Sequence, residues 1–277
     1  MTKALVLHSL VPVRGEASEC AEQLTQLLFG ETVDVLEQAE RWIRVCNDAD
    51  GMTGWVDFKM LTLMSDEEYT TYRAQIEKSC AYVRMPMAFA ASQNNRQTIP
   101  LTAGTRLPGY LPPQEGKGSA TFEILGVPFS IDPAMVLPKP MPLNKDSLMV
   151  LSRFFLNTPY LWGGKNALGM DCSGLTQVLM SLMGINILRN ASEQATQGTA
   201  VSRLADAEPC DLVFFDKGGK VTHVGILLNK NTVIHCSGRV KVEQIDEEGI
   251  VSSENNTLYK VGDHTHHLCA IRRFSRA

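Results

Sequence analysis

The chain has 277 residues, of which 44% are hydrophobic and 20% are charged, a composition typical of a globular protein and unlike that of a disordered chain or a coiled coil. Its 26 basic and 30 acidic residues leave a formal net charge of −4, which excludes a strongly basic protein that binds nucleic acid or anionic membranes through its overall charge. The length suggests about two domains, and three small ones are possible.

The seven cysteines are scattered along the chain and include no C-x-x-C pair. An odd, unpatterned set in a chain of this size is typical of free thiols in a reducing compartment, or of one thiol with a special role. The first residues reach the charged Arg14 too early for a signal peptide, and no stretch reaches about 18 uninterrupted apolar residues. We therefore expect a cytoplasmic protein without a membrane span; a leader outside this sequence would instead direct it to the periplasm or export it.

The first part of the chain predicts a small β-barrel with a closing helix, residues 1–78. Polar and apolar residues alternate over residues 31–36, and a second short strand is expected at residues 42–45. The turn signal at residues 50–51 then precedes a third strand at residues 54–56.

A helix is expected after Ser65. Ser65 and Glu68 fit a capping box. Tyr69, Tyr72 and Ile76 recur at the spacing of one helix face. This helix would close the first unit.

A weak internal repeat predicts a second small β-barrel in residues 79–141. Three positions recur at a nearly constant offset, and the middle glycine of each set precedes an alternating strand. The matched positions are Pro12, Gly30 and Gly54 in the first barrel and Pro86, Gly104 and Gly126 in the second.

Proline marks the end of this region. Nine of the thirteen prolines lie between Pro100 and Pro142, and four of them crowd residues 133–142. Proline fixes φ and lacks an N–H group, so the crowded stretch predicts a stiff, extended linker rather than a helix or a central strand. We place a boundary near residue 141, before a third unit of residues 142–277.

The third unit is predicted to begin with helices and to end with strands. Asn144 can cap a helix whose apolar face includes Leu151 and Phe155, and a second amphipathic helix covers residues 172–183. Helices followed by strands indicate an α+β layer rather than a parallel βαβ sheet. The expected strands are residues 211–216, 223–228, 233–236 and 270–274.

Cys172 is the thiol whose position changes its chemistry. It opens the second predicted helix, between Asp171 and Ser173. Unpaired backbone N–H groups and the helix dipole at such a position favour a thiolate, lower the pKa and could stabilise an oxyanion. The alternative is a small buried side chain that opens an amphipathic helix, the commoner role of a free cysteine.

Two histidines could serve such a thiol. His223 begins one apolar strand and His235 ends the next, so a hairpin between them would bring the two rings together. A nucleophilic thiol needs a base and a group that orients the base, and Cys172, His223 and His235 fit this requirement. Taken singly, each histidine is more simply interpreted as a hydrogen-bonded residue at a strand end.

Three further histidines, His264, His266 and His267, lie beside Asp263 in a predicted polar loop. A metal site is the alternative interpretation. However, their spacing matches no helical ligand pair, and no cysteine lies in register with them. We therefore predict no metal site.

Five short blocks in the C-terminal part of the chain carry a resemblance to a known family. They are residues 159–164, 171–174, 211–215, 223–226 and 234–235. Their order and spacing resemble the signature of NlpC-type bacterial cell-wall cysteine peptidases. The resemblance implies a papain-like α+β domain with Cys172 as nucleophile, His223 as general base and His235 as the residue that orients the base. It also implies that Tyr160 lies beside the thiol and helps to form the oxyanion site, and that no metal or cofactor is needed.

The N-terminal part narrows this resemblance. Residues 26–31 and 50–56 resemble bacterial SH3-like domains that precede this catalytic module, which implies two small SH3-like β-barrels. Two such domains followed by the peptidase resemble the γ-D-glutamyl-L-diamino-acid endopeptidases, sometimes named dipeptidyl-peptidase VI. The resemblance implies cleavage of short murein (peptidoglycan) peptides after D-glutamate. It also implies a preference for a free N-terminal L-alanine, which the first SH3-like domain helps to enforce.

The resemblance further implies a substrate site around the thiol. Acidic groups there would hold the substrate amine, since a desolvated ammonium needs a charged or strongly accepting partner. One of Glu16, Glu19 and Glu22 could supply a carboxylate. The residues assigned to substrate binding are Tyr160, Asp171, Ser173, Arg189 and Asn190.

Three positions depart from the family pattern. Asn190 stands where an aspartate is expected, Met52 where a tyrosine is expected, and Cys210 where a glycine is usual. The first two changes remove a charge and a hydrogen bond from the implied amine pocket. We therefore expect a less strict preference for a free L-alanine.

Two other functions remain open. The same scaffold could serve an amidase or an acyltransferase, although the SH3-like domains and the Arg189 segment favour the peptidase. A non-catalytic protein that binds wall peptides through its β-barrels is the other alternative, which an intact set of cysteine and histidines disfavours. No nucleic-acid partner is expected.

Overall fold

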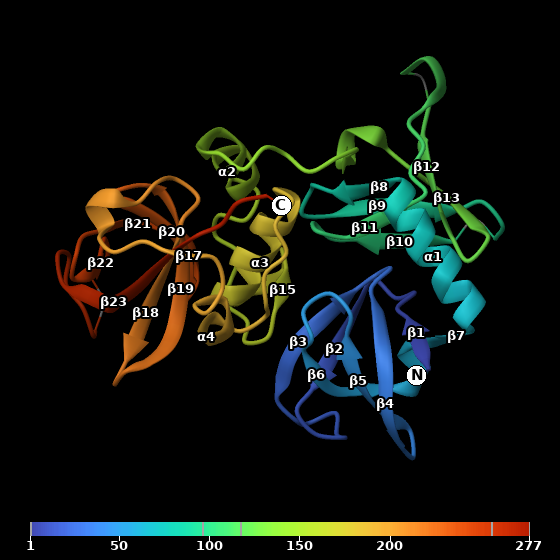
Figure 1. Ribbon diagram of the computed structural model, residues 1–277, viewed down its shortest axis with the longest axis horizontal. Helices are drawn as coiled ribbons and strands as arrows, with labels where there is room; N and C mark the ends of the chain where they lie inside the picture. Colours follow the sequence, from blue (N-terminus) through green and yellow to red (C-terminus); the bar gives the residue numbers. More distant parts are fainter. Residues whose placement is uncertain (1, 96, 117, 256, 277) are drawn as a thin grey trace. The chain divides into compact units, whose positions relative to one another are not determined.

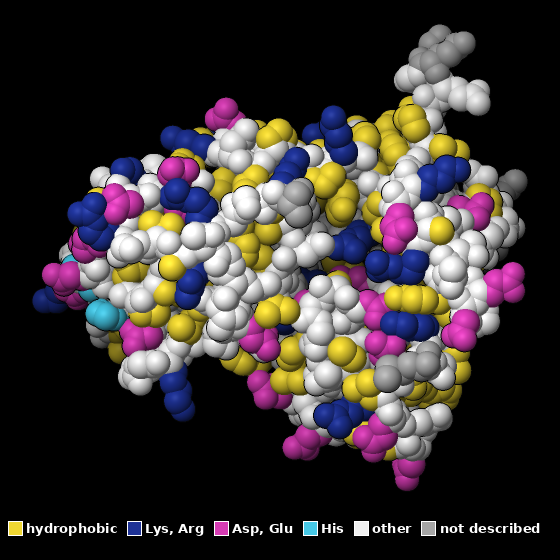
Figure 2. Space-filling view, in the orientation of Figure 1, with side chains coloured by type: hydrophobic (Ala, Val, Ile, Leu, Met, Phe, Trp, Pro, Cys, Tyr) yellow, Lys and Arg dark blue, Asp and Glu magenta, His cyan; other side chains and the backbone are white. Residues whose placement is uncertain are grey.

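The computed structural model describes residues 2–95, 97–116, 118–255 and 257–276 (Figure 1). The chain divides into two compact units, Met1–Pro140 and Met141–Ala277. No helix among the described residues is long and apolar enough to cross a membrane. Acidic and basic side chains are interspersed over the face shown in Figure 2, in keeping with the small net charge of −4.

The first β region forms one antiparallel sheet. It consists of β1 (Lys3–Leu5), β2 (Leu10–Arg14), β3 (Gln23–Leu28), β4 (Thr32–Ala39), β5 (Trp42–Asn47), β6 (Thr53–Asp57), the 3-10 helix η1 (Phe58–Met60) and β7 (Thr62–Met64). The strand order is β3-β2-β6-β5-β4-β1-β7. Apolar side chains such as Val33 and Val45 alternate along the strands and bury a shared core. The predicted strands at residues 31–36, 42–45 and 54–56 are confirmed as β4, β5 and β6.

Helix α1 (Asp66–Lys78) follows the predicted N-cap. Ser65 Oγ accepts the backbone N–H of Glu68 at 3.1 Å, and Glu68 Oε2 accepts the backbone N–H of Ser65 at 2.8 Å, which confirms the capping box. Tyr72 is 1% exposed, and its hydroxyl donates to the carbonyl oxygen of Gly30. The helix is thereby anchored to the first β region.

The second β region packs against the same helix. It consists of β8 (Cys80–Val83), β9 (Ala88–Ser92), β10 (Thr98–Leu101), β11 (Arg106–Pro108), η2 (Gln114–Gly116), β12 (Ala120–Ile124), β13 (Val127–Ile131), η3 (Pro133–Met135) and β14 (Val136–Leu137). Its sheets have the orders β10-β9-β13-β12 and β11-β8-β14. Its apolar side chains share a core with Leu5, Phe29 and Tyr72, so the two β regions form one compact unit.

The internal repeat is matched at its middle position. Gly30 and Gly104 have φ angles of 82° and 90°, and each donates its N–H to a valine carbonyl oxygen, at 2.8 and 2.9 Å. Glycine adopts such angles without the strain that a Cβ would cause. Gly54 and Gly126 are not equivalent, because Gly54 lies inside β6 whereas Gly126 lies in the turn between β12 and β13.

The predicted extended linker is shorter than expected. Pro133 opens the 3-10 helix η3, and β14 then pairs with β8. Proline is accommodated at the start of a helical turn, where its missing N–H would have no partner within the helix. The segment without helix or strand begins only at Pro138 and ends at Asn144.

The second unit begins with α2 (Lys145–Ser152), α3 (Cys172–Leu182) and α4 (Ala191–Gln194). Asn144 Oδ1 accepts the backbone N–H of Ser147 at 3.0 Å, which confirms the predicted cap. Helix α2 ends before Phe155, whose side chain is nevertheless fully buried. The second predicted helix is confirmed as α3.

A small sheet of two strands, β15 (Lys165–Asn166) and β16 (Gly169–Met170), lies between α2 and α3 in the chain. The larger sheet of the second unit consists of β17 (Thr199–Ala200), β18 (Leu212–Lys217), β19 (Lys220–Asn229), β20 (Thr232–Ser237), β21 (Arg239–Ile245), β22 (Gly249–Val251) and β23 (His264–Arg273), with η4 (Leu204–Asp206) before β18. The order is β17-β23-β18-β19-β20-β21-β22, and β22 also pairs with β23. Strands β18 to β23 therefore close on themselves around an apolar core. Helix α3 packs against β19 and β20 (Figure 1).

Three of the four strands predicted in this unit are confirmed with small changes of length, as β18, β19 and β20. The last one, residues 270–274, is part of a longer strand, β23. Strands β21 and β22 had not been predicted.

Candidate active site

The first turn of α3 holds Cys172 at a capped helix N-terminus. Asp171 is the N-cap, and its Oδ1 accepts the backbone N–H of Gly174 at 2.6 Å, which satisfies one of the N–H groups that lack a partner within the helix. A Cβ on Gly174 would lie 2.2 Å from the carbonyl oxygen of Gly164, so only glycine allows the helix to approach this loop. The cap and the close approach fix Cys172, whose side chain is 6% exposed.

Burial, rather than the helix N-terminus, dominates the electrostatics of the thiol. Burial and the carboxylate of Asp171 raise the pKa of Cys172 to about 12, and the backbone N–H groups of Val224 and Ser173 offset this only in part. The prediction of a lowered pKa was therefore wrong, because a helix start is visible in the sequence and the enclosure of the side chain is not. The thiol is protonated at neutral pH and needs a base.

The contact with Val224 locates the thiol relative to the predicted base. The backbone N–H of Val224 interacts with the Cys172 side chain. His223 is the preceding residue on the same strand, β19. The thiol therefore lies beside the part of β19 that carries His223.

His223, His235 and Glu243 form a hydrogen-bonded chain across β19, β20 and β21. The Nε2 of His223 lies 2.8 Å from the Nδ1 of His235. The Nε2 of His235 lies 2.9 Å from the Oε2 of Glu243. The three side chains are 6%, 0% and 3% exposed, respectively. The structure thus brings together the two histidines that the predicted hairpin paired, and it adds a buried carboxylate.

Gly225 makes the close pairing of these strands possible. It lies opposite His235 in the β19–β20 ladder. A Cβ on Gly225 would lie 2.5 Å from Cγ2 of Val233 and 3.2 Å from Cβ of His235. The glycine two residues after His223 is therefore required by packing next to His235.

Burial also affects the charge states of His223, His235 and Glu243. It lowers the pKa of His223 well below its ordinary value, and His235 and His266 lower it further. Burial lowers the pKa of His235 by more than Glu243 raises it. Although burial acts in the opposite direction, hydrogen bonds from His235, Ser253 and Lys241 lower the pKa of Glu243 well below its usual range. At neutral pH both histidines are neutral and Glu243 is ionised.

A buried ion pair ties the start of α3 to the preceding loop. Arg189 is 1% exposed and donates to both carboxylate oxygens of Asp171, at 3.0 and 2.7 Å. It also donates to Oγ of Ser173 at 2.8 Å, and Oδ2 of Asp171 accepts the N–H of Gly163 at 2.9 Å. Both oxygens of Asp171 thus have partners within the protein. Substrate contacts by Asp171, Ser173 and Arg189 stay predictions.

Tyr160 and Asn190 are the other residues assigned to the substrate. Tyr160 is 36% exposed, and burial together with the neighbouring Cys172 and Asp171 raises the pKa of its phenol, so a neutral hydroxyl lies near the thiol. Asn190 is the N-cap of α4, and its backbone N–H donates to Glu193 Oε2 at 3.1 Å. The structure places Tyr160 near Cys172, and a substrate contact by Asn190 stays a prediction.

The backbone explains the departure at Cys210. Its φ angle is 76°, in the left-handed region that favours glycine. The backbone at this position thus favours glycine, and cysteine adopts the same conformation with strain. Burial and Asp211 raise the pKa of the Cys210 thiol to about 11, so it is protonated at neutral pH.

The remaining residues of the implied amine pocket belong to the first unit. Met52 lies between β5 and β6. The exposed side chains of Glu16, Glu19 and Glu22 lie in the loop between β2 and β3, where Glu19 forms an ion pair with Arg41. Their part in holding an amine stays a prediction.

The predicted polar loop of histidines was wrong, because His264, His266 and His267 lie on strand β23. The partners of β23 shift register twice, opposite Phe214–Phe215 and opposite Ile250–Val251. These bulges interrupt the alternation by which a strand is recognised in a sequence.

The three histidines do not converge. His264 Nε2 lies 2.9 Å from Asp246 Oδ1, and His267 Nδ1 lies 2.9 Å from Asp216 Oδ1. The ring of His266 instead lies against that of His223, with 4.3 Å between the centroids. In the part of the chain that the structure describes, no group of three His, Cys, Asp or Glu side chains is placed to hold a metal ion.

Two buried histidines and the half-buried His266 predict that the stability of the second unit depends on pH. Burial lowers the pKa of His266 to about 4, and the pKa values of His223 and His235 are lowered too. The unfolded chain takes up protons near pH 6.5, whereas the folded chain takes them up only at lower pH, so the free energy of unfolding falls between pH 7 and pH 5. His266 alone accounts for roughly 2 kcal/mol of this fall. Hydrogen exchange of the β19 and β20 amides at the two pH values measures it.

Single substitutions separate the contributions. His266→Gln should remove its share of the loss, and His8→Gln, which changes a residue of the first unit, is the control. His264 acts in the opposite sense, because its hydrogen bond to Asp246 raises its pKa; His264→Gln should therefore enlarge the loss. A free energy of unfolding that is equal at pH 7 and pH 5 would show that the histidines titrate normally in the folded state.

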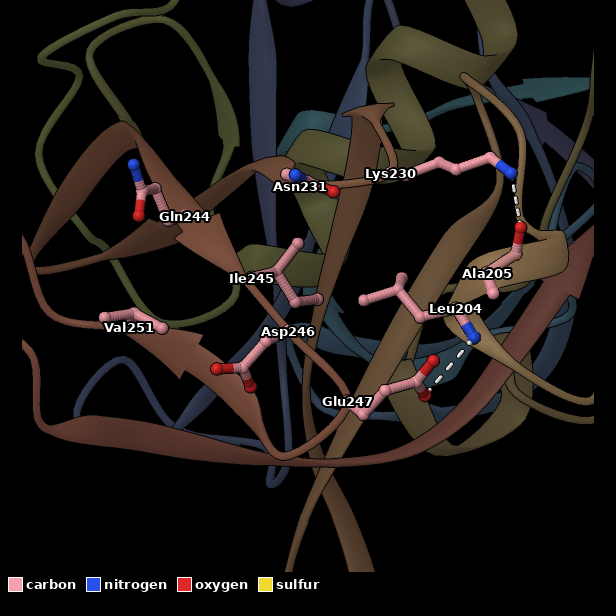
Figure 3. A pocket seen from close by; sticks show the side chains of 9 residues that line it. All are labelled: Leu204, Ala205, Lys230, Asn231, Gln244, Ile245, Asp246, Glu247 and Val251. Carbon is pink, nitrogen blue, oxygen red and sulfur yellow. Dashed lines mark hydrogen bonds between the residues drawn. The ribbon is translucent and has the colours of Figure 1, made fainter.

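A pocket of about 590 Å³ lies at the end of β21 (Figure 3). Lys230 Nζ donates to the carbonyl oxygen of Ala205, and the backbone N–H of Leu204 donates to Glu247 Oε2 at 3.4 Å. None of the residues predicted from the sequence lines it. The lining residues are Leu204, Ala205, Lys230, Asn231, Gln244, Ile245, Asp246, Glu247 and Val251.

Sequence reasoning missed Glu243 and Gln194. Glu243 lies in residues 239–245, where the sequence predicts no strand. A charged residue in such a segment predicts a side chain that is exposed to solvent. Gln194 is 0% exposed, and its Nε2 donates to the carbonyl oxygen of Ser173 at 3.1 Å. The position of Glu243 in a β-rich segment shortly after His235 could have indicated that its side chain lies near that histidine. Gln194 has no comparable feature in the sequence.

Comparison with known proteins defines the class. Residues 157–257 match the model of the NlpC/P60 family, and residues 13–61 match that of the bacterial dipeptidyl-peptidase SH3 domain. The chain therefore contains an NlpC/P60 cysteine peptidase domain, which is preceded in sequence by a bacterial dipeptidyl-peptidase SH3 domain.

Curated relatives narrow the class. Over 90% of its length the chain is homologous to the gamma-D-glutamyl-L-lysine dipeptidyl-peptidase of Bacillus subtilis (strain 168), with 29% identity over 259 residues that cover 80% of that relative. The protein of the same name from Bacillus cereus (strain ATCC 10987 / NRS 248) is 27% identical over 237 residues, which are 76% of this chain and 66% of that relative.

Solved structures support the fold. An NlpC/P60 family protein from Bacillus cereus ATCC 10987 has a TM-score of 0.77 at 22% identity, with 98% of this chain and 99% of that chain covered. An NlpC/P60 endopeptidase from Photobacterium damselae subsp. piscicida has a TM-score of 0.69 at 16% identity, with 88% and 66% covered. The fold is thus the expected one: SH3-like β regions followed by a papain-like α+β domain.

Proposed function

We propose that this protein is a cysteine endopeptidase that hydrolyses the γ-D-glutamyl-L-diamino-acid bond of short murein peptides, with L-Ala-γ-D-Glu-diamino acid as substrate. The observation that carries the proposal is Cys172 at the start of α3, beside strand β19, whose His223 is hydrogen-bonded to His235 and through it to Glu243. Homology over 90% of the chain to a gamma-D-glutamyl-L-lysine dipeptidyl-peptidase supports the substrate class. The cytoplasmic location stays a prediction.

In the first step, His223 acts as general base. Its Nε2 is engaged by His235, so Nδ1 takes the proton of the Cys172 thiol while Sγ attacks the γ-carbonyl carbon of D-glutamate. A base is needed because the raised pKa of about 12 leaves the thiol protonated. The backbone N–H at the start of α3 and the hydroxyl of Tyr160 stabilise the developing oxyanion.

In the second step, the proton on Nδ1 of His223 passes to the nitrogen of the diamino acid as the C–N bond breaks, and a thioester remains on Cys172. A water molecule then gives a proton to His223 and attacks the thioester. The C–S bond breaks, L-Ala-D-Glu leaves, and the proton returns from His223 to Sγ.

The test is product analysis on L-Ala-γ-D-Glu tripeptides that end in L-lysine or meso-diaminopimelate, with free and acetylated N-termini. We expect the dipeptide and the free diamino acid as products, and none of either from Cys172→Ala. The departures at Asn190 and Met52 predict that acetylated peptides are also cleaved, at a lower rate. Undiminished turnover by Cys172→Ala would contradict the proposal, and transfer of the dipeptide to an added amine instead of water would indicate an acyltransferase.

A further inference from the structure

Glu243 is a buried carboxylate whose capacity to accept hydrogen bonds is filled. Its Oε2 lies 2.9 Å from Nε2 of His235 and 3.0 Å from Nζ of Lys241. Its Oε1 accepts the backbone N–H and the hydroxyl of Ser253, at 3.1 and 2.9 Å. An ionised carboxylate offers about four lone-pair sites, so a proton on Glu243 would displace one of these donors. Glu243 is therefore ionised and acts only as an acceptor.

The strand register builds this arrangement. In the β20–β21 ladder, Lys241 lies opposite His235 and Glu243 lies opposite Val233. Residues two apart on a strand share a face, so the side chains of His235, Lys241 and Glu243 lie on one face of the sheet. The ammonium group of Lys241 balances the charge of the buried carboxylate.

The ionised carboxylate determines where the ring protons of the two histidines lie. A neutral imidazole carries one proton, on either Nδ1 or Nε2. His235 must donate from Nε2 to Glu243, so the lone pair of His235 is on Nδ1. That lone pair accepts a hydrogen bond, so His223 donates from Nε2 and keeps its own lone pair on Nδ1.

We propose that Glu243 is a positioning residue that acts through His235 to keep the lone pair of His223 on Nδ1, where it can receive the proton of Cys172. The catalytic consequence rests on the proposed function. With the reverse proton order, Nδ1 of His223 would carry hydrogen and could not accept the thiol proton. A carboxylate that orients a catalytic histidine through its second ring nitrogen works by the same principle, and here one more histidine lies between the carboxylate and the base.

The proton order is measured on the full-length protein without substrate, by ¹⁵N NMR of the histidine rings at pH 7. We expect His235 and His223 each to carry hydrogen on Nε2 and a lone pair on Nδ1. In Glu243→Gln, whose amide can donate as well as accept, we expect both tautomers of the two rings. A proton on Nδ1 of either neutral ring in the unsubstituted protein overturns the proposal.

Kinetics test the consequence for the reaction. Glu243→Gln should lower kcat by about ten- to a hundredfold, with KM changed by less than about twofold. In a His235→Asn background the same exchange should change kcat by less than about twofold, because the connection to His223 is already lost. An equal loss in both backgrounds would assign Glu243 a structural role and overturn the proposal. Glu248→Gln, which changes a side chain that is 79% exposed, is the matched control.

The two measurements separate this inference from the proposed function. If the protein cleaves no murein peptide, the proposed function fails, and the ring protons still decide the role of Glu243. If it cleaves the peptides while the two histidines carry hydrogen on Nδ1, the proposed role of Glu243 is rejected and the proposed function stands.

Discussion

Replacing His223 with alanine should lower kcat about a thousandfold, with little change in KM. Burial raises the pKa of the Cys172 thiol to about 12 and lowers the pKa of His223 well below its ordinary value. Both groups are therefore neutral at rest, and no preformed thiolate can attack without the base. Steady-state hydrolysis of an L-Ala-γ-D-Glu tripeptide measures the loss.

The pH profile checks the same charge state. His223 accepts a proton only while it is neutral, so kcat/KM should fall only below its lowered pKa, at a pH under about 6.5. His264→Ala, on the surface of β23, is the matched control and should keep normal activity. An acid limb above pH 7, or near-normal kcat in His223→Ala, would show that the thiol does not depend on this base.

Local signals were sufficient to predict several elements of the two units. The caps at Ser65 and Asn144, the helix that begins at Cys172, and the hairpin that pairs His223 with His235 each depend on a few neighbouring residues. Strand β23 depends on partners far away in the chain, and two bulges interrupt its alternation. A pattern of period two could therefore predict only its apolar end.

Burial was the property that the sequence did not reveal, and it explains both errors at the site. The start of a helix predicted a lowered pKa for Cys172, but enclosure of the thiol reverses the direction. Glu243 resembles a solvated residue of a strand, yet it is 3% exposed while the neighbouring Val242 is 39% exposed. Four donors from other positions stabilise the carboxylate in the interior, and a single strand cannot predict them.

Exchanging Arg189 for methionine should lower the free energy of unfolding of the second unit by about 3–5 kcal/mol. Arg189 is 1% exposed and contacts both oxygens of Asp171. Methionine would fill much of the space but leave Asp171 as a buried charge without its guanidinium partner. Urea-dependent hydrogen exchange of the α3 amides measures the change.

The origin of this loss can be tested with two further variants. Arg203→Met removes an ion pair whose side chains are 69% and 50% exposed and should change the free energy of unfolding by less than about 1 kcal/mol. Adding Asp171→Asn to Arg189→Met should restore part of the loss, because it removes the unpaired charge; no recovery would contradict this account. Asp171 also caps α3 and holds the N–H of Gly163. We therefore expect kcat to fall together with stability, since the same buried pair fixes the start of the helix that carries Cys172.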